Sequence, residues 1–411
     1  MNVEIISIGD ELLIGQVVNT NASWMATELN LSGFNVNKIS TISDKKQAII
    51  QSIDEAFASS DIILITGGLG PTNDDITKYT LCEYFDSKLI FNEESYENIN
   101  RLFATRGFVI TELNRKQAEV PDKCKVIINK NGTAPGMWFQ KDGKVLVSMP
   151  GVPFEMKAMM SESVIPELTK NNKSKIVHHT ILTTGAGESF LADLIKDWEA
   201  ELPEHINLAY LPQAGIVRLR LSAYGFDKNK LEEEIALYHQ KLNKLIPDLI
   251  FGYDDDTLQS VIGKILKAKS KTLATAESCT GGYIAHLITS IAGSSDYFKG
   301  SVVSYANEIK TDVLGVKQDT LINYGAVSEQ TVAEMAFGAI ALLKTDYAIA
   351  ISGIAGPDGG TNEKPVGTVW IAIAYGQNVS TKKFQFGNHR GRNIELASNA
   401  ALNILRKELL K

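Results

Sequence analysis

The sequence places a serine between an expected strand and an expected helix, in Thr275-Ala276-Glu277-Ser278-Cys279-Thr280-Gly281-Gly282. Residues 272–276 are apolar and strand-like, and residues 283–291 are helix-like. Two glycines allow a tight turn and the close approach of a ligand. The first N–H groups of a helix favour anions and developing oxyanions. Ser278 is therefore a candidate nucleophile, although serine before a helix most often serves as an N-cap.

A second stretch with residues that could bind a ligand is Thr66-Gly67-Gly68-Leu69-Gly70-Pro71-Thr72-Asn73-Asp74-Asp75, which follows an apolar, strand-like segment. Its glycines let the main chain wrap an anion, to which Thr72 and the N–H groups can donate. Asp74 and Asp75 fall at the expected start of a helix, where the dipole favours carboxylates. One interpretation is a turn with an N-capping Asp. The other is a site for metal-bound pyrophosphate, because Mg²⁺-type ions take a few carboxylates together with phosphate oxygens.

Alternating strands and helices must position these loops. In the first part of the chain, strands are expected at 2–9, 34–42 and 61–66, and helices at 21–31 and 45–58. This alternation predicts parallel βαβ units, which bind ligands beyond the carboxyl ends of their strands. Near the other end, a buried strand at 346–352 leads into a second glycine-rich loop, residues 353–360. The sequence therefore predicts two α/β domains, each with loops at the carboxyl ends of strands.

Between them the pattern changes. The polar run 169–175 is typical of a linker, and residues 176–250 read as a small α+β unit without obvious chemistry. The predicted domains are 1–170, 175–250 and 256–411, which agrees with a length of 411 residues.

Composition narrows the class of protein. The chain is 44% hydrophobic and 22% charged, with a net charge of −7, so direct binding to nucleic acid is not expected. Its three cysteines have no paired spacing, which argues against a disulfide framework or a thiolate zinc site. The sequence contains no apolar run of about 20 residues that could span a membrane, and its first residues do not resemble a signal peptide. We expect a cytoplasmic protein.

These stretches, taken together, resemble the CinA (competence/damage-inducible protein A) family over essentially the full length. The matching motifs are GDELLIGQVVNTNA, TGGLGPTNDDIT, NRKQA, GTAPG, MPGVPFEM, AESCTGG, SYANEIK, SGIAGPDGG, PVGTVW and the segment around Arg390. The resemblance implies an N-terminal α/β domain of the molybdopterin-binding (MogA/MoaB) type. It also implies a KH-type α+β middle domain and a C-terminal α/β amidase domain.

The resemblance also implies two activities. The C-terminal domain is expected to hydrolyse the amide of nicotinamide mononucleotide (NMN), giving nicotinic acid mononucleotide and ammonia. The N-terminal domain is expected to be a metal-dependent ADP-ribose pyrophosphatase, and the protein a homodimer. Two alternatives stay open: a non-catalytic accessory protein in competence or the DNA-damage response, and a pterin-binding protein of molybdenum-cofactor synthesis.

For the amidase, the family motif implies Ser278 as nucleophile and Lys310 as base, with Tyr305 orienting the lysine or relaying a proton. A lysine can act as a base only if burial or a nearby cation lowers its pKa. Backbone N–H groups near residues 280–282 are the expected oxyanion donors, and no cofactor is expected. The residues expected to bind substrate are Thr280, Gly281, Gly282, Asn307, Ser352, Gly353, Ala355, Gly356 and Arg390. The segment Gly387-Asn388-His389-Arg390 departs from many relatives, which have an acidic residue before the arginine.

For the N-terminal site, the resemblance implies a divalent metal (Mg, Mn or Co, possibly with K⁺) on the diphosphate, with an activated water. The carboxylates available for it are those of Asp10, Glu11, Asp74 and Asp75. The residues expected to contact the nucleotide are Gly9, Asn19, Thr20, Gly67, Gly68, Gly70, Thr72, Gly132, Thr133, Ala134, Pro150 and Gly151.

Overall fold

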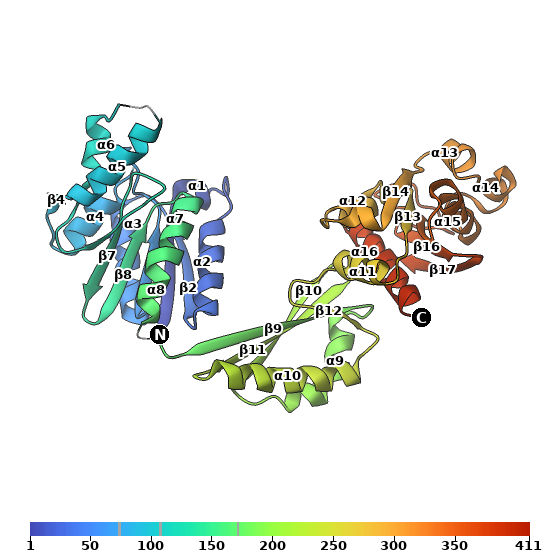
Figure 1. The fold of residues 1–411 in the computed structure, drawn as a ribbon, viewed down its shortest axis with the longest axis horizontal. Coiled ribbons are helices and arrows are strands. Elements are labelled where there is room, and N and C mark those ends of the chain that lie inside the picture. Colours follow the sequence, from blue (N-terminus) through green and yellow to red (C-terminus); the bar gives the residue numbers. More distant parts are fainter. Residues whose placement is uncertain (73–74, 107–108, 171) are drawn as a thin grey trace. The chain divides into compact units, whose positions relative to one another are not determined.

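The computed structural model describes residues 1–72, 75–106, 109–170 and 172–411 (Figure 1). The chain divides into two compact units. One contains Met1–Val177 and Ala223–Glu232, and the other contains His178–Ser222 and Glu233–Lys411. Among the described residues, no helix is both long enough and apolar enough to cross a membrane.

The first unit is built on a six-stranded sheet with the order β2-β1-β3-β8-β7-β6. Its strands are β1 (Asn2–Ile8), β2 (Asn35–Ile42), β3 (Ile62–Thr66), β6 (Lys125–Ile127), β7 (Gly136–Lys141) and β8 (Lys144–Met149). The neighbours among β2, β1, β3 and β8 are parallel, as the alternation of strands and helices predicts. Strands β6 and β7 add an antiparallel edge that was not predicted. The Asp142-Gly143 turn, in which both residues have positive φ, joins β7 to β8 as a tight hairpin.

Helices cover both faces of this sheet. They are α1 (Asp10–Leu13), α2 (Thr20–Leu31), α3 (Lys46–Ser59), α4 (Thr77–Tyr84), α5 (Glu93–Arg106), α6 (Glu112–Lys116), α7 (Pro153–Met159) and α8 (Ile165–Thr169). A π-helical turn, Met160–Val164, joins α7 to α8. One core contains side chains of α2, α7 and α8, and the other contains those of α3 and α4. A short antiparallel pair, β4 (Leu89–Phe91) and β5 (Glu119–Pro121), lies outside the main sheet.

The middle of the chain forms a four-stranded sheet with the order β10-β11-β9-β12. Its elements are β9 (Lys175–Thr184), α9 (Glu188–Ala200), β10 (Ile206–Gln213), β11 (Ile216–Gly225), α10 (Lys228–Leu245) and β12 (Ile250–Tyr253). Ala214 and Gly215 form the hairpin turn between the adjacent strands β10 and β11.

The last part of the chain is a five-stranded sheet with the order β14-β13-β15-β16-β17. Its strands are β13 (Leu273–Glu277), β14 (Phe298–Val303), β15 (Tyr347–Gly353), β16 (Thr368–Tyr375) and β17 (Asn378–Gln385). Strand β13 lies between β14 and β15 and is parallel to both, while β16 and β17 are antiparallel additions. The loops that follow β13, β14 and β15 therefore meet at one edge of the sheet.

Two helical layers enclose this sheet (Figure 1). The helices are α11 (Leu258–Ala268), α12 (Tyr283–Thr289), α13 (Asn307–Asp312), α14 (Gln318–Tyr324), α15 (Glu329–Leu343) and α16 (Arg390–Leu410), with a 3-10 turn at Ser294–Asp296. Helices α11, α12 and α16 pack with Ile349 and Ile351 of β15, whereas α15 packs with Ala348 and Ala350. Successive β15 residues thus face opposite cores, which fixes the strand's register.

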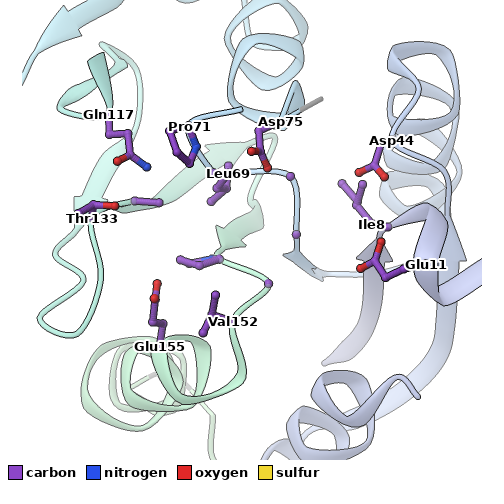
Figure 2. A pocket seen from close by; sticks show the side chains of 17 residues that line it. Ile8, Glu11, Asp44, Leu69, Pro71, Asp75, Gln117, Thr133, Val152 and Glu155 are labelled. Carbon is purple, nitrogen blue, oxygen red and sulfur yellow. The ribbon is translucent and has the colours of Figure 1, made fainter. Parts of the chain in front are cut away.

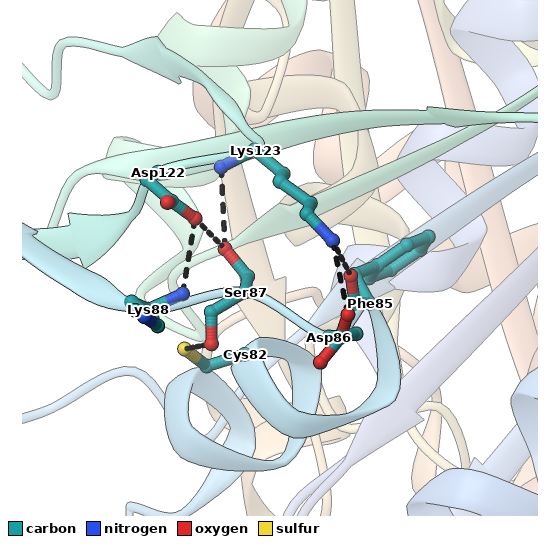
Figure 3. A network of polar contacts seen from close by, with 7 residues as sticks. All are labelled: Cys82, Phe85, Asp86, Ser87, Lys88, Asp122 and Lys123. Carbon is teal, nitrogen blue, oxygen red and sulfur yellow. Dashed lines mark hydrogen bonds and ion pairs between the residues drawn. The ribbon is translucent and has the colours of Figure 1, made fainter.

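In the first unit, a polar network joins the end of α4 to the segment between β5 and β6 (Figure 3). The Ser87 hydroxyl donates to Asp122 at 2.6 Å, and the Lys88 N–H donates to the same carboxylate oxygen at 3.0 Å. The Lys123 N–H donates to the Ser87 hydroxyl oxygen at 3.2 Å. The Ser87 hydrogen bond is the largest cause that holds the pKa of Asp122 below its usual value.

We expect Asp122→Asn to lower the thermal midpoint of the first unit and Asp122→Ala to lower it further. The asparagine weakens two charge-assisted hydrogen bonds and the alanine removes them. Because the folded pKa is lowered, this stabilisation is present above the ordinary Asp pKa and is lost as the pH falls through the folded value. Thermal unfolding at pH 7 and at pH 3 measures both effects. Asp86→Asn is the control, because the Asp86 side chain is fully exposed and its single ion pair, with Lys123, is long at 3.5 Å. Equal thermal midpoints for all variants at pH 7 would contradict the prediction.

Candidate functional site

The structure brings Ser278 and Lys310 together at the edge where β13 and β14 end. The two strands are paired so that Glu277 lies opposite Val303, which places the next residues, Ser278 and Ser304, side by side. Helix α13 begins three residues after Ser304 and returns the Lys310 amine to this edge. Its Nζ lies 3.2 Å from the Ser278 Oγ and 2.6 Å from the Ser304 carbonyl oxygen.

Lys310 is almost completely buried, with 1% of its surface exposed. Its contacts are a hydroxyl and a carbonyl, and within the described parts of the chain no salt bridge joins it to a carboxylate. Burial therefore lowers the pKa of Lys310, while the Cys279 and Glu308 side chains oppose that effect more weakly. A neutral amine at this distance can accept the proton of the Ser278 hydroxyl, which is what a general base must do.

A cavity of about 220 Å³ opens onto this pair. Eight of the predicted residues line it: Ser278, Tyr305, Asn307, Lys310, Ser352, Gly353, Ala355 and Arg390. Cys279, Ala326 and Val327 also line it and were not predicted. Ala326 and Val327 precede α15, and the Ser352 hydroxyl holds this loop by donating to the Ala326 carbonyl at 2.7 Å. No local sequence signal marks that loop, because its place depends on the fold of the sheet.

Arg390 and Tyr305 form a polar pair on the wall of this cavity. The Arg390 guanidinium donates to the Gly356 carbonyl at 2.9 Å and to the Tyr305 hydroxyl at 3.1 Å. Gly356 thus supports the arginine through its main chain and is not among the lining residues. The Tyr305 hydroxyl contacts Arg390, and no hydrogen bond of the described residues joins it to Lys310 or Ser278. The geometry directs Tyr305 to the arginine instead of to the proposed base.

The prediction that the N–H groups of residues 280–282 receive an oxyanion is wrong for Gly281 and Gly282. The Gly281 N–H donates to the Ser278 carbonyl at 3.1 Å and the Gly282 N–H donates to Glu277, whereas the Thr280 N–H stays a candidate. The N–H groups of Gly282, Ile284 and Ala285 donate to the carboxylate of Glu277, at 3.1, 3.0 and 2.8 Å, so they are not free to receive an oxyanion. Accordingly Thr280, Gly281 and Gly282 do not line the cavity. Gly281 and Gly282 instead make the turn, with φ values of 62° and 95°. In the described chain, the N–H groups of Cys279 and Thr280 carry no hydrogen bond and are the nearest main-chain donors to Ser278.

The first unit contains a larger cavity of about 380 Å³ at the carboxyl ends of β1, β3 and β8 (Figure 2). Ten predicted residues line it: Gly9, Glu11, Gly67, Gly68, Gly70, Asp75, Thr133, Ala134, Pro150 and Gly151. Gly67 and Gly68 have positive φ, and a Cβ on Gly67 would lie 2.2 Å from the Ile8 carbonyl oxygen. Within the described residues, the N–H groups of residues 68–70 have no partner, so this loop can donate to an anion.

Several predicted residues have other roles. Asn19 caps α2 by accepting from the Ala22 N–H at 3.1 Å, and with Thr20 it lines a smaller neighbouring cavity. Asp75 does not cap α4 as expected; its carboxylate accepts from the main-chain N–H of Thr72 at 3.0 Å, and from the Thr72 hydroxyl.

Asp10, Thr72 and Gly132 do not line the large cavity. A Cβ on Gly132 would lie 2.2 Å from a Glu155 oxygen, so that glycine makes room for Glu155. Asp74 lies outside the described residues.

Sequence reasoning missed Asp44, Gln117 and Glu155, which also line the large cavity. They follow β2, follow α6 and lie within α7, so only the folded chain brings them to one place. Gln117 is 5% exposed and its Oε1 atom has no partner within the described residues. A buried amide oxygen without a partner is a candidate acceptor for a ligand hydroxyl or amine. The NRKQA motif was the available signal for this position.

The large cavity is acidic. Glu11, Asp44, Asp75 and Glu155 line it, and its described lining contains no lysine or arginine. Figure 2 shows Asp44 and Glu11 on the same side of the cavity, beside Ile8, with Asp75 and Glu155 apart from them. Across the parts of the chain that are described, no group of three or more His, Cys, Asp or Glu residues could hold a metal ion by itself. The arrangement fits a cation that takes one or two carboxylates and completes its shell with phosphate oxygens and water, as Mg²⁺ does.

Comparison with known protein families divides the chain into three matches. Residues 4–170 match the probable molybdopterin binding domain, residues 178–252 the damage-inducible protein CinA KH domain, and residues 255–409 the CinA C-terminal domain. The chain is therefore a mixed α/β protein of three domains, with a probable molybdopterin-binding N-terminal domain, a KH middle domain and a CinA C-terminal domain.

Two relatives match almost the whole of this chain over almost the whole of their own length. The chain is 48% identical over 410 residues to a CinA-like protein of Cytophaga hutchinsonii, covering 99% of this chain and 97% of that one. It is 50% identical over 414 residues to a CinA-like protein of Flavobacterium psychrophilum, covering 100% and 99%. A crystal structure of a competence/damage inducible protein from Agrobacterium tumefaciens is 40% identical, covers 38% of this chain and 94% of that one, and has a TM-score of 0.37.

The Ser278–Lys310 contact predicts a reactive serine whose reactivity depends on pH. A fluorophosphonate, which bonds covalently to activated serine hydroxyls, should label Ser278 faster as the pH rises. The midpoint should lie below the value of about 10.4 for a free lysine, because only the neutral amine accepts the proton.

Lys310→Ala should slow this labelling by about 10²-fold or more, the usual contribution of a general base. Mass spectrometry of the labelled peptide measures the rate, and Lys299→Ala, at an exposed lysine on β14, is the matched control. Labelling of Ser278 that is independent of both pH and Lys310 would show that the amine does not activate the hydroxyl.

Proposed function

The chain belongs to the CinA family, and we propose that its C-terminal domain hydrolyses the amide of nicotinamide mononucleotide to nicotinic acid mononucleotide and ammonia. The observation that carries this proposal is the buried Lys310 amine, 3.2 Å from the hydroxyl of Ser278, at a cavity that also contains an arginine. An amidase needs a nucleophile, a base and oxyanion donors, and the lining of this cavity supplies candidates for all three.

The reaction follows from these positions. Neutral Lys310 accepts the Ser278 proton while Oγ attacks the amide carbonyl, and the oxygen becomes an oxyanion facing the N–H groups of Cys279 and Thr280. The protonated Lys310 then gives its proton to the leaving nitrogen, the C–N bond breaks, and ammonia departs. A water attacks the resulting ester while Lys310 accepts one of its protons, and Lys310 returns that proton to the Ser278 Oγ as the C–Oγ bond breaks. The carboxylic acid product loses its own proton to solvent and leaves as the carboxylate. The Ser304 carbonyl orients the amine throughout, because it accepts a second Nζ hydrogen at 2.6 Å.

Arg390 is proposed to bind the substrate phosphate. A guanidinium pairs with phosphate through parallel N–H groups, and this one is held in place by Gly356 and Tyr305. Tyr305 is accordingly proposed to orient Arg390. Asn307 and Ser352, on two other walls of the cavity, are proposed to contact the ribose and the amide.

Ser278→Ala should lower kcat for ammonia release from NMN by about 10⁴-fold or more, since it removes the nucleophile. Arg390→Ala should instead raise KM by about 10- to 100-fold, the loss of one or two charge-assisted hydrogen bonds, with a smaller effect on kcat. A coupled ammonia assay measures both. Arg392→Ala is the control, because Arg392 is exposed and does not line this cavity. Ammonia release by Ser278→Ala at the wild-type rate would refute the nucleophile assignment.

For the N-terminal domain we propose metal-dependent hydrolysis of ADP-ribose at the diphosphate. Four carboxylates without a lysine or arginine would repel a diphosphate, so the anion must enter with a cation. A divalent metal, when bound, neutralises the diphosphate and activates the attacking water. Glu11, Asp44, Asp75 and Glu155 are the residues available to hold it, and the N–H groups of residues 68–70 are available to bind phosphate oxygens.

AMP formation from ADP-ribose should therefore need Mg²⁺, Mn²⁺ or Co²⁺ and stop when a chelator is added, whereas ammonia release from NMN by the same sample should continue. Glu11→Gln should lower AMP formation by about 10-fold or more, the usual effect of disturbing a metal site. Chromatography of the products measures AMP, and ammonia release serves as the internal control. AMP formation that persists in chelator would contradict the metal requirement.

The match of residues 4–170 to a probable molybdopterin binding domain favours one second candidate, a pterin-binding function. Calorimetric titration of the protein with a pterin and with ADP-ribose plus Mg²⁺ separates the two functions. A homodimer is also proposed, and sedimentation measures it. An accessory role in competence or the damage response would be indicated if both assays showed no turnover.

A further inference from the structure

Glu277, the residue before Ser278, is a completely buried carboxylate with no part in the reaction steps above. It is the last residue of β13 and has 0% of its surface exposed. Isolated buried carboxylates are costly because they lose their hydration. Glu277 must therefore have a dense set of donors, or it must be protonated.

The donors all come from the turn and helix that follow Ser278, except for one on the strand itself. One carboxylate oxygen accepts from the Thr280 hydroxyl at 2.7 Å and from the N–H groups of Gly282 and Ile284. The other accepts from the Ala285 N–H at 2.8 Å and from the Thr275 hydroxyl at 3.2 Å. Five hydrogen bonds satisfy the charge, and the start of α12 adds a favourable dipole.

We propose that Glu277 is a positioning residue, which locks the turn 278–282 so that the Ser278 hydroxyl faces the Lys310 amine. The inference rests on the proposed amidase function. The chain must leave β13, expose one hydroxyl at the cavity and enter α12 within five residues, through two glycines with positive φ. Glycines make this turn possible but leave it free to adopt other conformations. The Glu277 carboxylate, which precedes the turn, hydrogen-bonds to N–H groups at the end of the turn and in α12, and so restricts the turn to one conformation.

The same contacts exclude two other roles for Glu277. It does not line the cavity, and no hydrogen bond within the described chain joins it to Ser278 or Lys310, so it is not a second base. It also occupies the α12 N–H groups that would otherwise compete for the substrate phosphate or oxyanion. The donors left next to Ser278 are the N–H groups of Cys279 and Thr280. Glu277 thereby selects where an oxyanion can be bound.

Glu277→Gln tests this role with little change in volume. A glutamine has one acceptor oxygen, so its NH₂ group must face either the Ala285 N–H or the N–H groups of Gly282 and Ile284. We expect kcat for ammonia release to fall by about 10²-fold, the effect of misplacing a reacting group by about 1 Å. KM for NMN should change less than about threefold, and the pH midpoint of kcat/KM should stay within a few tenths of a unit. Glu329→Gln is the matched control, because Glu329 is an exposed first-turn glutamate of α15 and should leave activity unchanged.

Each outcome decides the matter. A folded Glu277→Gln protein with wild-type kcat, or with a shifted pH midpoint, overturns the positioning role. If Glu277→Gln does not fold, Thr280→Val removes one of the five donors and should lower kcat by about threefold to tenfold at constant KM. Unchanged kcat in that variant would also overturn it.

Fluorophosphonate labelling of Ser278 separates this inference from the proposed function. If wild-type protein releases no ammonia from NMN, the proposed function fails, and labelling still tests Glu277. Labelling of Glu277→Gln about 10²-fold slower than wild type supports the positioning role, and equal rates overturn it.

Discussion

The burial of a single amine constrains the arrangement of the C-terminal domain. Lys310 is removed from water, and no carboxylate among the described residues forms a salt bridge with it, so its surroundings favour the neutral form. In the described chain its Nζ has two hydrogen-bonding partners, both oxygens, and both are placed by the parallel pairing of β13 with β14. The central sheet therefore determines the chemistry of the amine directly, because the register of two strands sets which hydroxyl the lysine meets.

The two cavities differ in how they can accept an anionic nucleotide. The C-terminal cavity contains its own cation, Arg390, held by a carbonyl and a tyrosine hydroxyl. The described lining of the N-terminal cavity is acidic, and its donors are main-chain N–H groups of a glycine-rich loop. The divalent metal proposed for that cavity would supply the positive charge that its lining lacks. This difference, more than the shared α/β architecture, supports two separate activities on one chain.

Much of the fold could be predicted from the sequence, and the physical reason is visible in particular elements. Strands β1, β3 and β15 are short, buried and rich in Ile, and they correspond to the strands expected at residues 2–9, 61–66 and 346–352. The helix expected to begin near Asp74 and Asp75 corresponds to α4, whereas α5 and α6 were not predicted, since α5 is strongly polar and α6 has only five residues. The β7–β8 hairpin was also missed, although its Asp-Gly turn is a strong local signal.

The candidate sites show a different limit. Residue types and loops after strands were enough to name Ser278 and the segment 67–70 as candidates. Each pattern also fits an ordinary capped turn, and the resemblance to a known family favoured the functional interpretation. These patterns were not enough to decide which N–H groups would be free. The N–H groups of residues 68–70 have no partner within the described chain. At the start of α12, by contrast, the N–H groups donate to the carboxylate of Glu277. In the sequence Glu277 is only the last residue of an expected strand, and its hydrogen bonds to the following turn and helix appear only in the folded chain. A helix start predicted from sequence is thus a donor site only when no carboxylate of its own chain can reach it, and that condition depends on three-dimensional geometry.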